Sequence, residues 1–572
     1  MPALVVRVRS IRLPTQELAI FHPAGHLGQP GNPFGKDIAN AGLFRALAQH
    51  GQYAQVNVLN QLQLPPGDLA LALYPDGQIR SAVATAPLHS TDVPARGGVL
   101  LRGQPYLSEL AWIRQSAGRQ LDYSLVGLIH TLAPPTIREM IGSCAISPVE
   151  SWDALVCSSP AVQDAMQAMF DQWHAYASDR YGAQRLIRPE LATIPLAVDV
   201  ERMGAMADAQ ESGDRFRRTH GIDFEDTVVL WVGRLSFYEK AFPQPMFIAL
   251  ERAAQQLDQR LCFVMAGWFP DGDVDRRRYQ QAADIYAPSV RLILVDGNEP
   301  DVLAGCWSTA DVFLSLVDNI QETFGLTPVE AMAAGIPVVL SDWDGYRSTV
   351  QDGVQGYLVP TLGSRAPQMG TLLANLHMLS LETYQTYVGA VAQHTAVNID
   401  IAVKALVDLV RSPELRRRMG QAGRVQAQQS FSWPAVVAQY NTLFERLSEQ
   451  RARAKANATA ASLSSLNHPF RGNPFADFEG FATQVMHPSL EFSADASMTP
   501  ELAVERLRTV DLDRMFAGLH ASEAEVLALL AAFTDGQRHA LADLQARFLP
   551  VRSEAIALTL AWLCKLGVLR WH

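Results

Sequence analysis

The stretch QETFGLTPVEAMAAGIPVVLSDWDG, residues 321–345, decides the fold of this chain. Residues 327–330 have the pattern of a capping box with proline at the first helical position, so they predict the start of a helix. Gly335 predicts the end of that helix, and the apolar run 336–341 predicts a buried strand after it. A short helix between buried strands is typical of an open α/β sheet.

The same alternation extends on both sides of this stretch. Helical segments such as 245–257 and 328–334 separate apolar runs at 227–232, 261–266, 291–295, 311–316 and 336–341. Runs that are apolar throughout predict strands buried on both faces of a parallel sheet. A weaker form of the pattern occupies the first 200 residues, with a helix at 36–49 and strand-like runs at 18–21, 124–129, 154–157 and 191–195. We therefore expect an α/β fold of two Rossmann-like halves with a cleft between them.

Composition restricts the class of protein. The chain has 572 residues, 48% of them hydrophobic, and its net charge of −11 argues against a general nucleic-acid binder. Residues 1–21 lack the features of a secretory signal, and no apolar run approaches the length of a membrane span. The cysteines are scattered and form no C-x-x-C pair, which predicts reduced thiols in a cytoplasmic protein without integral membrane association: Cys144, Cys157, Cys262, Cys306 and Cys564.

The last 120 residues differ in pattern from the rest. Residues 450–500 are rich in Ala, Ser, Asn and Pro and read as a linker. Residues 501–572 contain three amphipathic helical segments and an apolar strand at 568–571, which predicts a winged-helix-like module. Its basic and acidic residues nearly balance, so packing against the rest of the chain or dimerisation is favoured over DNA reading.

Two glutamates flank the predicted helix start. The backbone amides of Phe324, Gly325 and Leu326 would point from the helix N-terminus into the cleft and form an anion site. Glu322 precedes this turn and Glu330 lies inside the helix, and carboxylates readily accept hydrogen bonds from the paired hydroxyls of a sugar or ribose. The alternatives are that Glu330 serves only as part of the cap and that Glu322 is a surface acid.

A second element lies ninety residues earlier, in WVGRLSFYEKA at 231–241. A predicted strand ends at Gly233, and Arg234 and Lys240 follow it in a loop. Two cations at the carboxyl end of a strand suit a diphosphate, although such residues also occur in solvated loops. The combination with Glu322 and Glu330 is what makes the pattern specific.

Together these motifs resemble the family 4 retaining glycosyltransferases, whose signature is two glutamates separated by seven residues. GRLSFYEKA and ETFGLTPVEAMAAGIPVV carry the resemblance, and 194–203 and 344–360 extend it over most of residues 20–448. It implies a GT-B fold, with an N-terminal acceptor domain at 1–205 and a nucleotide-sugar donor domain at 206–430 that holds an insertion at about 362–402. It also implies that a helix at 431–449 crosses back to the first domain.

The resemblance also implies roles for single residues. Glu322 would hold hydroxyls of the transferred sugar, and Glu330 would hold the ribose of the nucleotide. Arg234 and Lys240 would neutralise the diphosphate, and the amides of residues 324–326 would bind the β-phosphate and the sugar. The sequence departs from the family in the spacing of Arg234 and Lys240, which is one residue longer than usual, and in Ala241, where glycine is common.

The N-terminal half supplies two further candidates. A Gly-rich loop leads into the helix at Lys36, but Pro30 and Asp37 stand where a P-loop needs glycine and Ser/Thr. The resemblance instead implies that Gly35 approaches the donor phosphate or the acceptor. His130 follows the run 124–129 and should face the cleft, where the resemblance implies contact with the transferred sugar. A purely structural histidine is the alternative.

The sequence as a whole predicts a retaining glycosyltransferase that moves a sugar from a nucleotide diphosphate sugar to a saccharide, natural-product or protein acceptor. No cofactor and no metal are expected, because Asp271 and Asp273 read as solvated loop residues and the two cations can stabilise the leaving group. The alternatives are a sugar phosphorylase, a nucleotide-sugar hydrolase or epimerase, and a non-catalytic scaffold. A homo-oligomer is compatible with the sequence.

Overall fold

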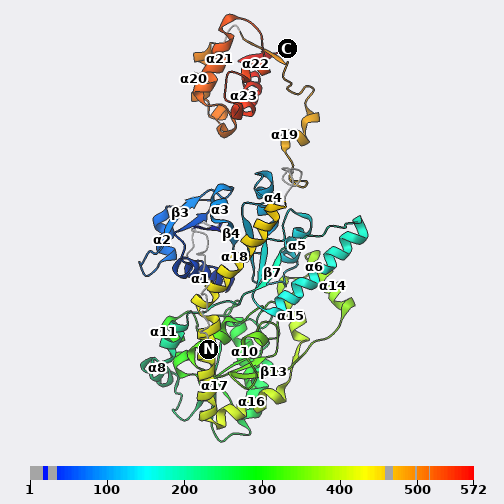
Figure 1. The fold of residues 1–572 in the computed structure, drawn as a ribbon. Coiled ribbons are helices and arrows are strands. Elements are labelled where there is room, and N and C mark those ends of the chain that lie inside the picture. The colour runs from blue at the N-terminus through cyan, green and yellow to red at the C-terminus, as the bar shows by residue number, and fades with distance from the viewer. Residues whose placement is uncertain (1–16, 24–34, 63, 458–467, 496–498, 515) are drawn as a thin grey trace, which may run out of the picture. The chain divides into compact units, whose positions relative to one another are not determined.

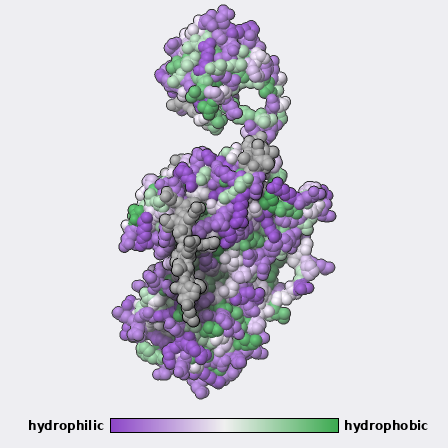
Figure 2. Space-filling view, viewed as in Figure 1, coloured by the Kyte–Doolittle hydropathy of each residue, from purple (hydrophilic) through white to green (hydrophobic). Residues whose placement is uncertain are grey.

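The computed structural model describes residues 17–23, 35–62, 64–457, 468–495, 499–514 and 516–572 (Figure 1). The chain divides into two compact units, Met1–Leu466 and Asn467–His572, and each is described by itself. Among the described residues no helix is long and apolar enough to cross a membrane. Figure 2 shows mainly hydrophilic side chains on the visible face of each unit, with small scattered hydrophobic groups.

The N-terminal half of the first unit is built on a seven-stranded parallel sheet in the order β3-β2-β1-β4-β5-β6-β7. Its strands are β1 (Glu17–Phe21), β2 (Gln55–Leu59), β3 (Ala82–Ala86), β4 (Val99–Arg102), β5 (Ser124–Ile129), β6 (Ala154–Cys157) and β7 (Glu190–Thr193). The helices of this half are α1 (Gly35–His50), α2 (Pro66–Leu73), α3 (Asp92–Gly97), α4 (Leu107–Ser116), α5 (Pro135–Gly142) and α6 (Pro160–Tyr181). Strand order reverses between β1 and β4, where an open sheet of this kind leaves a crevice for ligands.

The second half repeats this order in a six-stranded parallel sheet, β10-β9-β8-β11-β12-β13. Its strands are β8 (Thr227–Val232), β9 (Leu261–Ala266), β10 (Arg291–Val295), β11 (Val312–Ser315), β12 (Val338–Ser341) and β13 (Gly356–Val359). Its helices are α7 (Val200–Ala207), α8 (Gln210–His220), α9 (Gln244–Ala254), α10 (Asp273–Tyr286), α11 (Pro300–Thr309), α12 (Leu326–Ala334), α13 (Tyr346–Thr349), α16 (Ile399–Arg411) and α17 (Pro413–Gln426). The prediction of two Rossmann-like halves is confirmed, and the second crevice lies between β8 and β11.

The predicted capping box at residues 327–330 is wrong. Helix α12 begins at Leu326, one residue before Thr327, and Gly325 is its N-cap with a φ of +94° and no side-chain hydrogen bond. The Thr327 hydroxyl instead hydrogen-bonds to Tyr346. Glu330 is therefore not a capping residue, and its carboxyl is left for another role.

Helix α18 (Trp433–Ala456) returns to the N-terminal half. Its buried face packs with the strands of the first sheet in one core through Val436, Tyr440 and Phe444. The chain crosses between the halves at two adjacent places, since Val198 N–H donates to the carbonyl of Phe431 at 2.9 Å and Val198 also bridges to Ser432.

A buried ion pair connects helix α4 of the N-terminal half to the residue before β6. Arg114 on α4 and Asp153 before β6 are both fully buried, with two contacts of 2.7 Å between guanidinium and carboxylate. The Asp153 carboxylate also accepts the backbone N–H groups of Leu125 and Glu150 at 2.8 Å. Pairing and hydrogen bonding together make such a charge tolerable in the interior.

The segment predicted as an insertion at about 362–402 forms two helices. Antiparallel strands β14 (Thr361–Leu362) and β15 (Ala396–Val397) close its base, and α14 (Pro367–Met378) and α15 (Tyr384–Gln393) lie between them. Helix α15 packs against the loop after β8, because a Cβ on Gly389 would lie 2.9 Å from the Cβ of Tyr238. The inserted helices therefore border the loops that carry the candidate site.

The second unit has its own hydrophobic core. It contains α19 (Pro474–Asp477), α20 (Pro500–Thr509), α21 (Glu523–Ala531), α22 (Leu541–Gln545), α23 (Ser553–Lys565) and an antiparallel sheet ordered β17 (His539–Ala540), β16 (Glu491–Ala494), β18 (Leu569–Trp571). The predicted linker 450–500 is wrong at both ends. Helix α18 continues to Ala456, where Arg451 is held by the Ser124 hydroxyl, and β16 is the central strand, with Phe492 fully buried.

Candidate functional site

The predicted residues gather where strands of the second sheet end. Arg234 and Lys240 lie in the loop after β8, and Glu322 lies in the loop that joins β11 to α12. These loops leave the sheet on either side of its point of strand reversal. His130 follows β5 of the first sheet and contacts the second half through its backbone. The structure thus brings both halves of the first unit to one place.

Glu322 forms an ion pair with Lys240. The Lys240 ammonium donates to Glu322 Oε2 at 3.1 Å, and the Glu322 side chain is only 13% exposed. Burial opposes ionisation of Glu322, but the charge of Lys240 and the backbone N–H groups of Thr323 and Phe324 hold the pKa of its carboxyl below the ordinary value. The Glu322 carboxylate is therefore ionised at neutral pH and fixed in the cleft, not a surface acid.

Arg234 has a carboxylate partner that the sequence did not suggest. Its guanidinium contacts Glu239 Oε2 at 2.6 Å, and both side chains are largely buried, at 16% and 9% exposure. Gln385 of α15 donates to the other oxygen of Glu239 at 3.3 Å. Gly233 begins this loop directly after β8. The two cations thus stand in one loop, and each is held in position by an acid.

At the N-terminus of α12, Phe324 and Gly325 can contact a ligand only through their backbone groups. The Phe324 side chain is 2% exposed and packs edge-on against Phe431, with ring centroids 5.8 Å apart, so it points into the core. Gly325 has a positive φ of +94°, and a Cβ there would lie 2.1 Å from the ring of Tyr346. The Phe324 N–H is bonded to the Glu322 carboxylate, so the N–H groups of Gly325 and Leu326 are the ones that this helix end presents to an anion.

Glu330 is a carboxyl whose protonation is sensitive to its surroundings. Burial raises its pKa to about 7, and the positive charge of Arg202 on α7 only partly offsets that rise. A carboxyl in such a place gains from ligand hydroxyls, because they would solvate the charge that burial disfavours. This property fits the ribose contact that the resemblance implies.

His130 is held by hydrogen bonds. Its Nε2 lies 2.9 Å from Asn40 Oδ1 and 3.1 Å from the carbonyl of Gly103, so Nε2 carries the hydrogen and both oxygens accept. Burial lowers its pKa to about 4, and the nearby Lys36 contributes to the lowering. The imidazole is therefore neutral. Because Lys36 follows Gly35 at the start of α1, this helix end also lies near the site.

Thr323 links the two halves at the site. Its hydroxyl donates to the carbonyl of His130 at 2.8 Å, and its own carbonyl accepts from the hydroxyl of Ser158 at 3.1 Å. Neither Thr323 nor Ser158 was predicted, and nothing in the local sequence distinguishes them from other small polar residues. Their contacts fix the backbone next to Glu322 against the N-terminal half.

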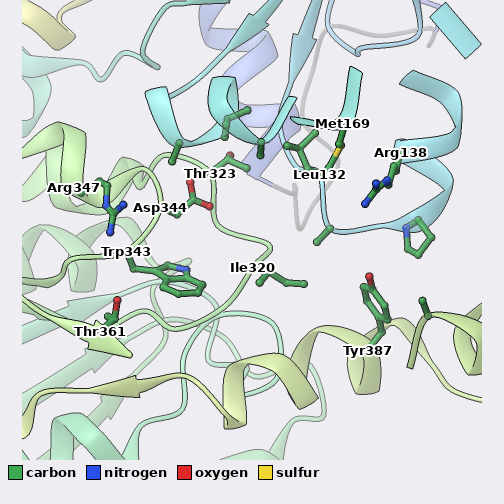
Figure 3. A pocket seen from close by; sticks show the side chains of 16 residues that line it. Leu132, Arg138, Met169, Ile320, Thr323, Trp343, Asp344, Arg347, Thr361 and Tyr387 are labelled. Atoms are coloured by element: carbon green, nitrogen blue, oxygen red, sulfur yellow. The ribbon is translucent and has the colours of Figure 1, made fainter. Parts of the chain in front are cut away.

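A cavity of about 670 Å³ opens beside Thr323 (Figure 3). It is lined by side chains of both halves and of the inserted helices, and most of them are apolar. Asp344 is the acid in this lining, and its Oδ1 is buried without a hydrogen-bond partner among the described residues. Burial raises the pKa of Asp344 to about 7, and the negative charge of Glu322 adds to the rise, while the Gly345 N–H and Arg347 oppose it.

The described residues contain no cluster of three or more His, Cys, Asp or Glu that could hold a metal ion. Asp271 and Asp273 are exposed at the start of α10, so their interpretation as solvated residues is confirmed. The charged groups present at the crevice are instead the paired cations Arg234 and Lys240 with their carboxylates.

Comparison with known proteins finds a family model that matches part of the second half. Residues 213–365 match the family model described as Glycosyl transferases group 1. This segment contains Arg234, Lys240, Glu322 and Glu330, so the resemblance drawn from those motifs is confirmed.

The similar proteins that cover most of the first unit have low sequence identity to this chain, and those of higher identity cover a smaller part of it. A D-inositol 3-phosphate glycosyltransferase of Corynebacterium glutamicum (strain R) is 24% identical over 356 residues, covering 60% of this chain and 71% of that protein. A protein of the same name from Mycobacterium sp. (strain KMS) is 33% identical over 167 residues, covering 29% of this chain and 36% of that protein. A sucrose-phosphate synthase structure from Thermosynechococcus elongatus is 19% identical with a TM-score of 0.45, covering 76% of this chain and 100% of that one.

Proposed function

We propose that this chain, a glycosyltransferase with a donor domain of the group 1 family, transfers a sugar from a nucleotide diphosphate sugar to a hydroxyl acceptor. We further propose that the anomeric configuration is retained and that no metal ion takes part. The observation that carries the proposal is the pairing of Lys240 with Glu322 beside the N-terminus of α12. A cation, a carboxylate and the backbone amides of Gly325 and Leu326 there match the diphosphate and the hydroxyls of such a donor.

Electrostatic stabilisation of the leaving group would supply most of the catalysis. As the bond between the anomeric carbon and the β-phosphate oxygen breaks, negative charge develops on the diphosphate. Arg234, Lys240 and the amides of Gly325 and Leu326 are already oriented, so they would stabilise this charge with little rearrangement. Removing one such group from an enzyme typically costs about 10²–10³ in rate.

The carboxylates have separate roles in this proposal. Glu322 is kept ionised by Lys240 and would accept hydrogen bonds from hydroxyls of the transferred sugar. Glu330, on the first turns of α12, would accept hydrogen bonds from the ribose. Neutral His130 would contact the same sugar through Nδ1, because Nε2 is engaged by Asn40 and Gly103. Retention of configuration rests on the likeness of the Glu322–Glu330 spacing to that of retaining enzymes.

Thermal unfolding with a panel of nucleoside diphosphates and nucleotide sugars tests the donor site. A ligand that binds only the native state at a hundredfold excess over its Kd adds about 2.7 kcal/mol of stability. We expect such a shift for one nucleotide class, and we expect Arg234→Ala to lose it. Glu239→Gln, which removes the charge of the partner but keeps Arg234, should keep the shift.

Two results would contradict the proposal. One is the absence of stabilisation by every nucleotide, and the other is an unchanged shift in Arg234→Ala. NMR of the product formed from the stabilising donor would identify the configuration at the anomeric carbon, and an inverted product would reject the proposed retention. Activity that is unaffected by EDTA is expected from a site that uses cations of the protein.

A further inference from the structure

We infer that Asn319, in the loop between β11 and α12, is a positioning residue that fixes Lys240 and Glu322 relative to each other. The inference rests on the proposed function, because the geometry of this pair affects a rate only if a sugar is transferred. Asn319 is fully buried, so its side chain acts through its protein neighbours.

The sheet alone does not hold Lys240 and Glu322 in place. Lys240 lies in the loop after β8, which ends at Val232, and Glu322 lies in the loop after β11, which ends at Ser315. The hydrogen bonds between the strands therefore stop well before either residue. A lysine side chain is also flexible, and that of Lys240 is 34% exposed. Contacts between the two loops have to supply the missing restraint.

The side chain of Asn319 supplies such a contact. Its Nδ2 donates to the carbonyl of Tyr238 at 2.8 Å, and its Oδ1 accepts the N–H of Gln321 at 2.9 Å. A carbonyl only accepts and an N–H only donates, so one orientation of the amide makes both bonds. Tyr238 lies two residues before Lys240, and Gln321 directly precedes Glu322. One buried amide thus joins the backbones beside the two charged residues.

The backbone of Asn319 adds two further contacts. Its carbonyl accepts the N–H of Glu322 at 3.3 Å and the indole N–H of Trp343 at 3.0 Å. Trp343 lies in the loop after β12, so three loops of the donor half meet at Asn319. Buried polar groups whose hydrogen bonds are made keep one arrangement, because breaking any of them leaves an unsatisfied group in the interior.

Asp318 holds the other end of the Lys240 segment. The N–H of Phe242 donates to Asp318 Oδ2 at 3.4 Å, and Asp318 is 1% exposed. The carbonyl of Tyr238 and the N–H of Phe242 are thus bonded to two consecutive residues of the opposite loop. Lys240 lies midway between these two anchors, so its backbone is restrained on both sides.

The position requires a side chain with one donor and one acceptor in a fixed geometry. An asparagine amide provides both, whereas alanine provides neither and an ionised aspartate provides only the acceptor. Without the bond to Tyr238, the loop of Lys240 can shift relative to Glu322. A displacement of about 1 Å in a catalytic group can cost about 10²-fold in rate. A purely structural asparagine would instead affect only the free energy of unfolding.

A double-mutant cycle separates these two roles. The probes are UDP-glucose, UDP-N-acetylglucosamine and GDP-mannose, and the assay measures release of UDP or GDP from the one that stabilises the wild type most. In Asn319→Ala we expect kcat to fall about 10²-fold while the KM for the donor changes less than about threefold. In a Lys240→Met background the same substitution should lower kcat less than about threefold, because no ion pair remains to be positioned.

Asn57→Ala is the matched control. Asn57 is 2% exposed, its Oδ1 accepts from Gln55 at 2.6 Å, and its Nδ2 donates to Glu17 at 3.0 Å, but it lies in β2 of the first sheet. Both alanine variants should lose stability in urea unfolding, and only Asn319→Ala should lose kcat. Asn319→Asp, which keeps the volume and the acceptor oxygen, is measured as well. It should show the same dependence on Lys240 even if the alanine variant does not fold.

Three results would overturn the inference. They are a kcat in the Asn319 variants within about threefold of the wild type, an equal fall of kcat with and without Lys240, and an equal fall in Asn57→Ala. Each of them requires a nucleotide sugar that stabilises the wild type. They therefore differ from the failure of the proposed function, in which no nucleotide binds at all.

Discussion

Lys240 Nζ and Glu322 Oε2 lie 3.1 Å apart although 82 positions separate the two residues in the chain. One follows β8 and the other follows β11, which are adjacent strands at the reversal of strand order. The pair therefore spans the crevice of the donor half. It keeps a carboxylate charged in a buried place and holds an ammonium group where the proposed function puts the diphosphate.

Removal of the Lys240 charge should impair catalysis while the protein stays folded. In Lys240→Met the buried Glu322 loses the charge that lowers its pKa, so its pKa should rise and fewer molecules should carry the carboxylate at neutral pH. The leaving group also loses one cation, and we expect the rate of nucleoside diphosphate release to fall about 10²–10³-fold. Lys404→Met, at an exposed position on α16, is the control and should retain full activity. A Lys240→Met enzyme with wild-type turnover would exclude the assigned role.

Glu330 should make the stability of the protein depend on pH. Its pKa is about 7 in the folded chain and 4.5 in its ordinary state, so the folded state holds the proton more tightly. Its contribution to stability is then fully present below pH 4.5 and is lost as the pH rises through about 7. The cost at pH 8 is about 3 kcal/mol, since each pKa unit corresponds to about 1.4 kcal/mol.

Glu330→Gln should therefore raise the Tm at pH 8 and leave it nearly unchanged at pH 5, measured by thermal unfolding in matched buffers. The same variant should bind the donor more weakly, because an amide is a poorer acceptor for ribose hydroxyls than a carboxylate. Glu445→Gln, at an exposed position of α18, should show no difference between the two pH values. A lower Tm of Glu330→Gln at pH 8 would contradict this interpretation of the site.

Arg114→Ala should destabilise the N-terminal half strongly. It would leave the carboxylate of Asp153 buried without its cation, and breaking one side of a buried pair costs about 3–5 kcal/mol. Arg188→Ala removes a pair with Asp171 whose side chains are 40% and 61% exposed, and exposed pairs contribute little. Urea unfolding of both variants would compare them, and similar midpoints would show that the Arg114–Asp153 pair is not important for stability.

The second unit should be dispensable for donor binding. Its helices and its sheet bury a core of their own, so a chain that ends at residue 466 keeps both Rossmann-like halves complete. We expect this chain to unfold cooperatively and to show the same stabilisation by nucleotide. A chain that ends at residue 432 lacks α18, which would expose the core around Val436, Tyr440 and Phe444, and it should not fold. Loss of nucleotide binding in the 1–466 chain would assign the second unit a part in the site.

The sequence predicted those strands that are apolar throughout. The runs 227–232 and 261–266 match the inner strands β8 and β9, because strands buried on both faces need apolar side chains at nearly every position, and the run 291–295 matches the edge strand β10. Strands β2, β3 and β4 were not predicted. In β2 the polar Gln55 and Asn57 interrupt the apolar run, and β3 is an edge strand of small, partly exposed residues.

In the candidate site, too, some residues could be predicted from the sequence and others could not. Glu322, Arg234 and Lys240 could be predicted because each lies in a motif that is local in the sequence. The groups around them could not be predicted, since the pairing of Glu239 with Arg234 and the contact of Ser158 with the backbone beside Glu322 depend on how the loops fold. The capping-box prediction at 327–330 failed because the Thr327 hydroxyl is bonded to Tyr346 rather than to its own helix end.

The chain crosses between the halves near Val198 and Ser432, and Thr323 makes a further connection between them through its hydrogen bonds to His130 and Ser158. Any separation of the two halves at this point would have to break both hydrogen bonds of Thr323. Because Glu322 directly precedes Thr323, the same separation would move the Glu322 carboxylate away from the N-terminal half. In the proposed reaction, departure of the nucleotide from between the halves would then depend on these two hydrogen bonds as well as on the groups that bind the diphosphate.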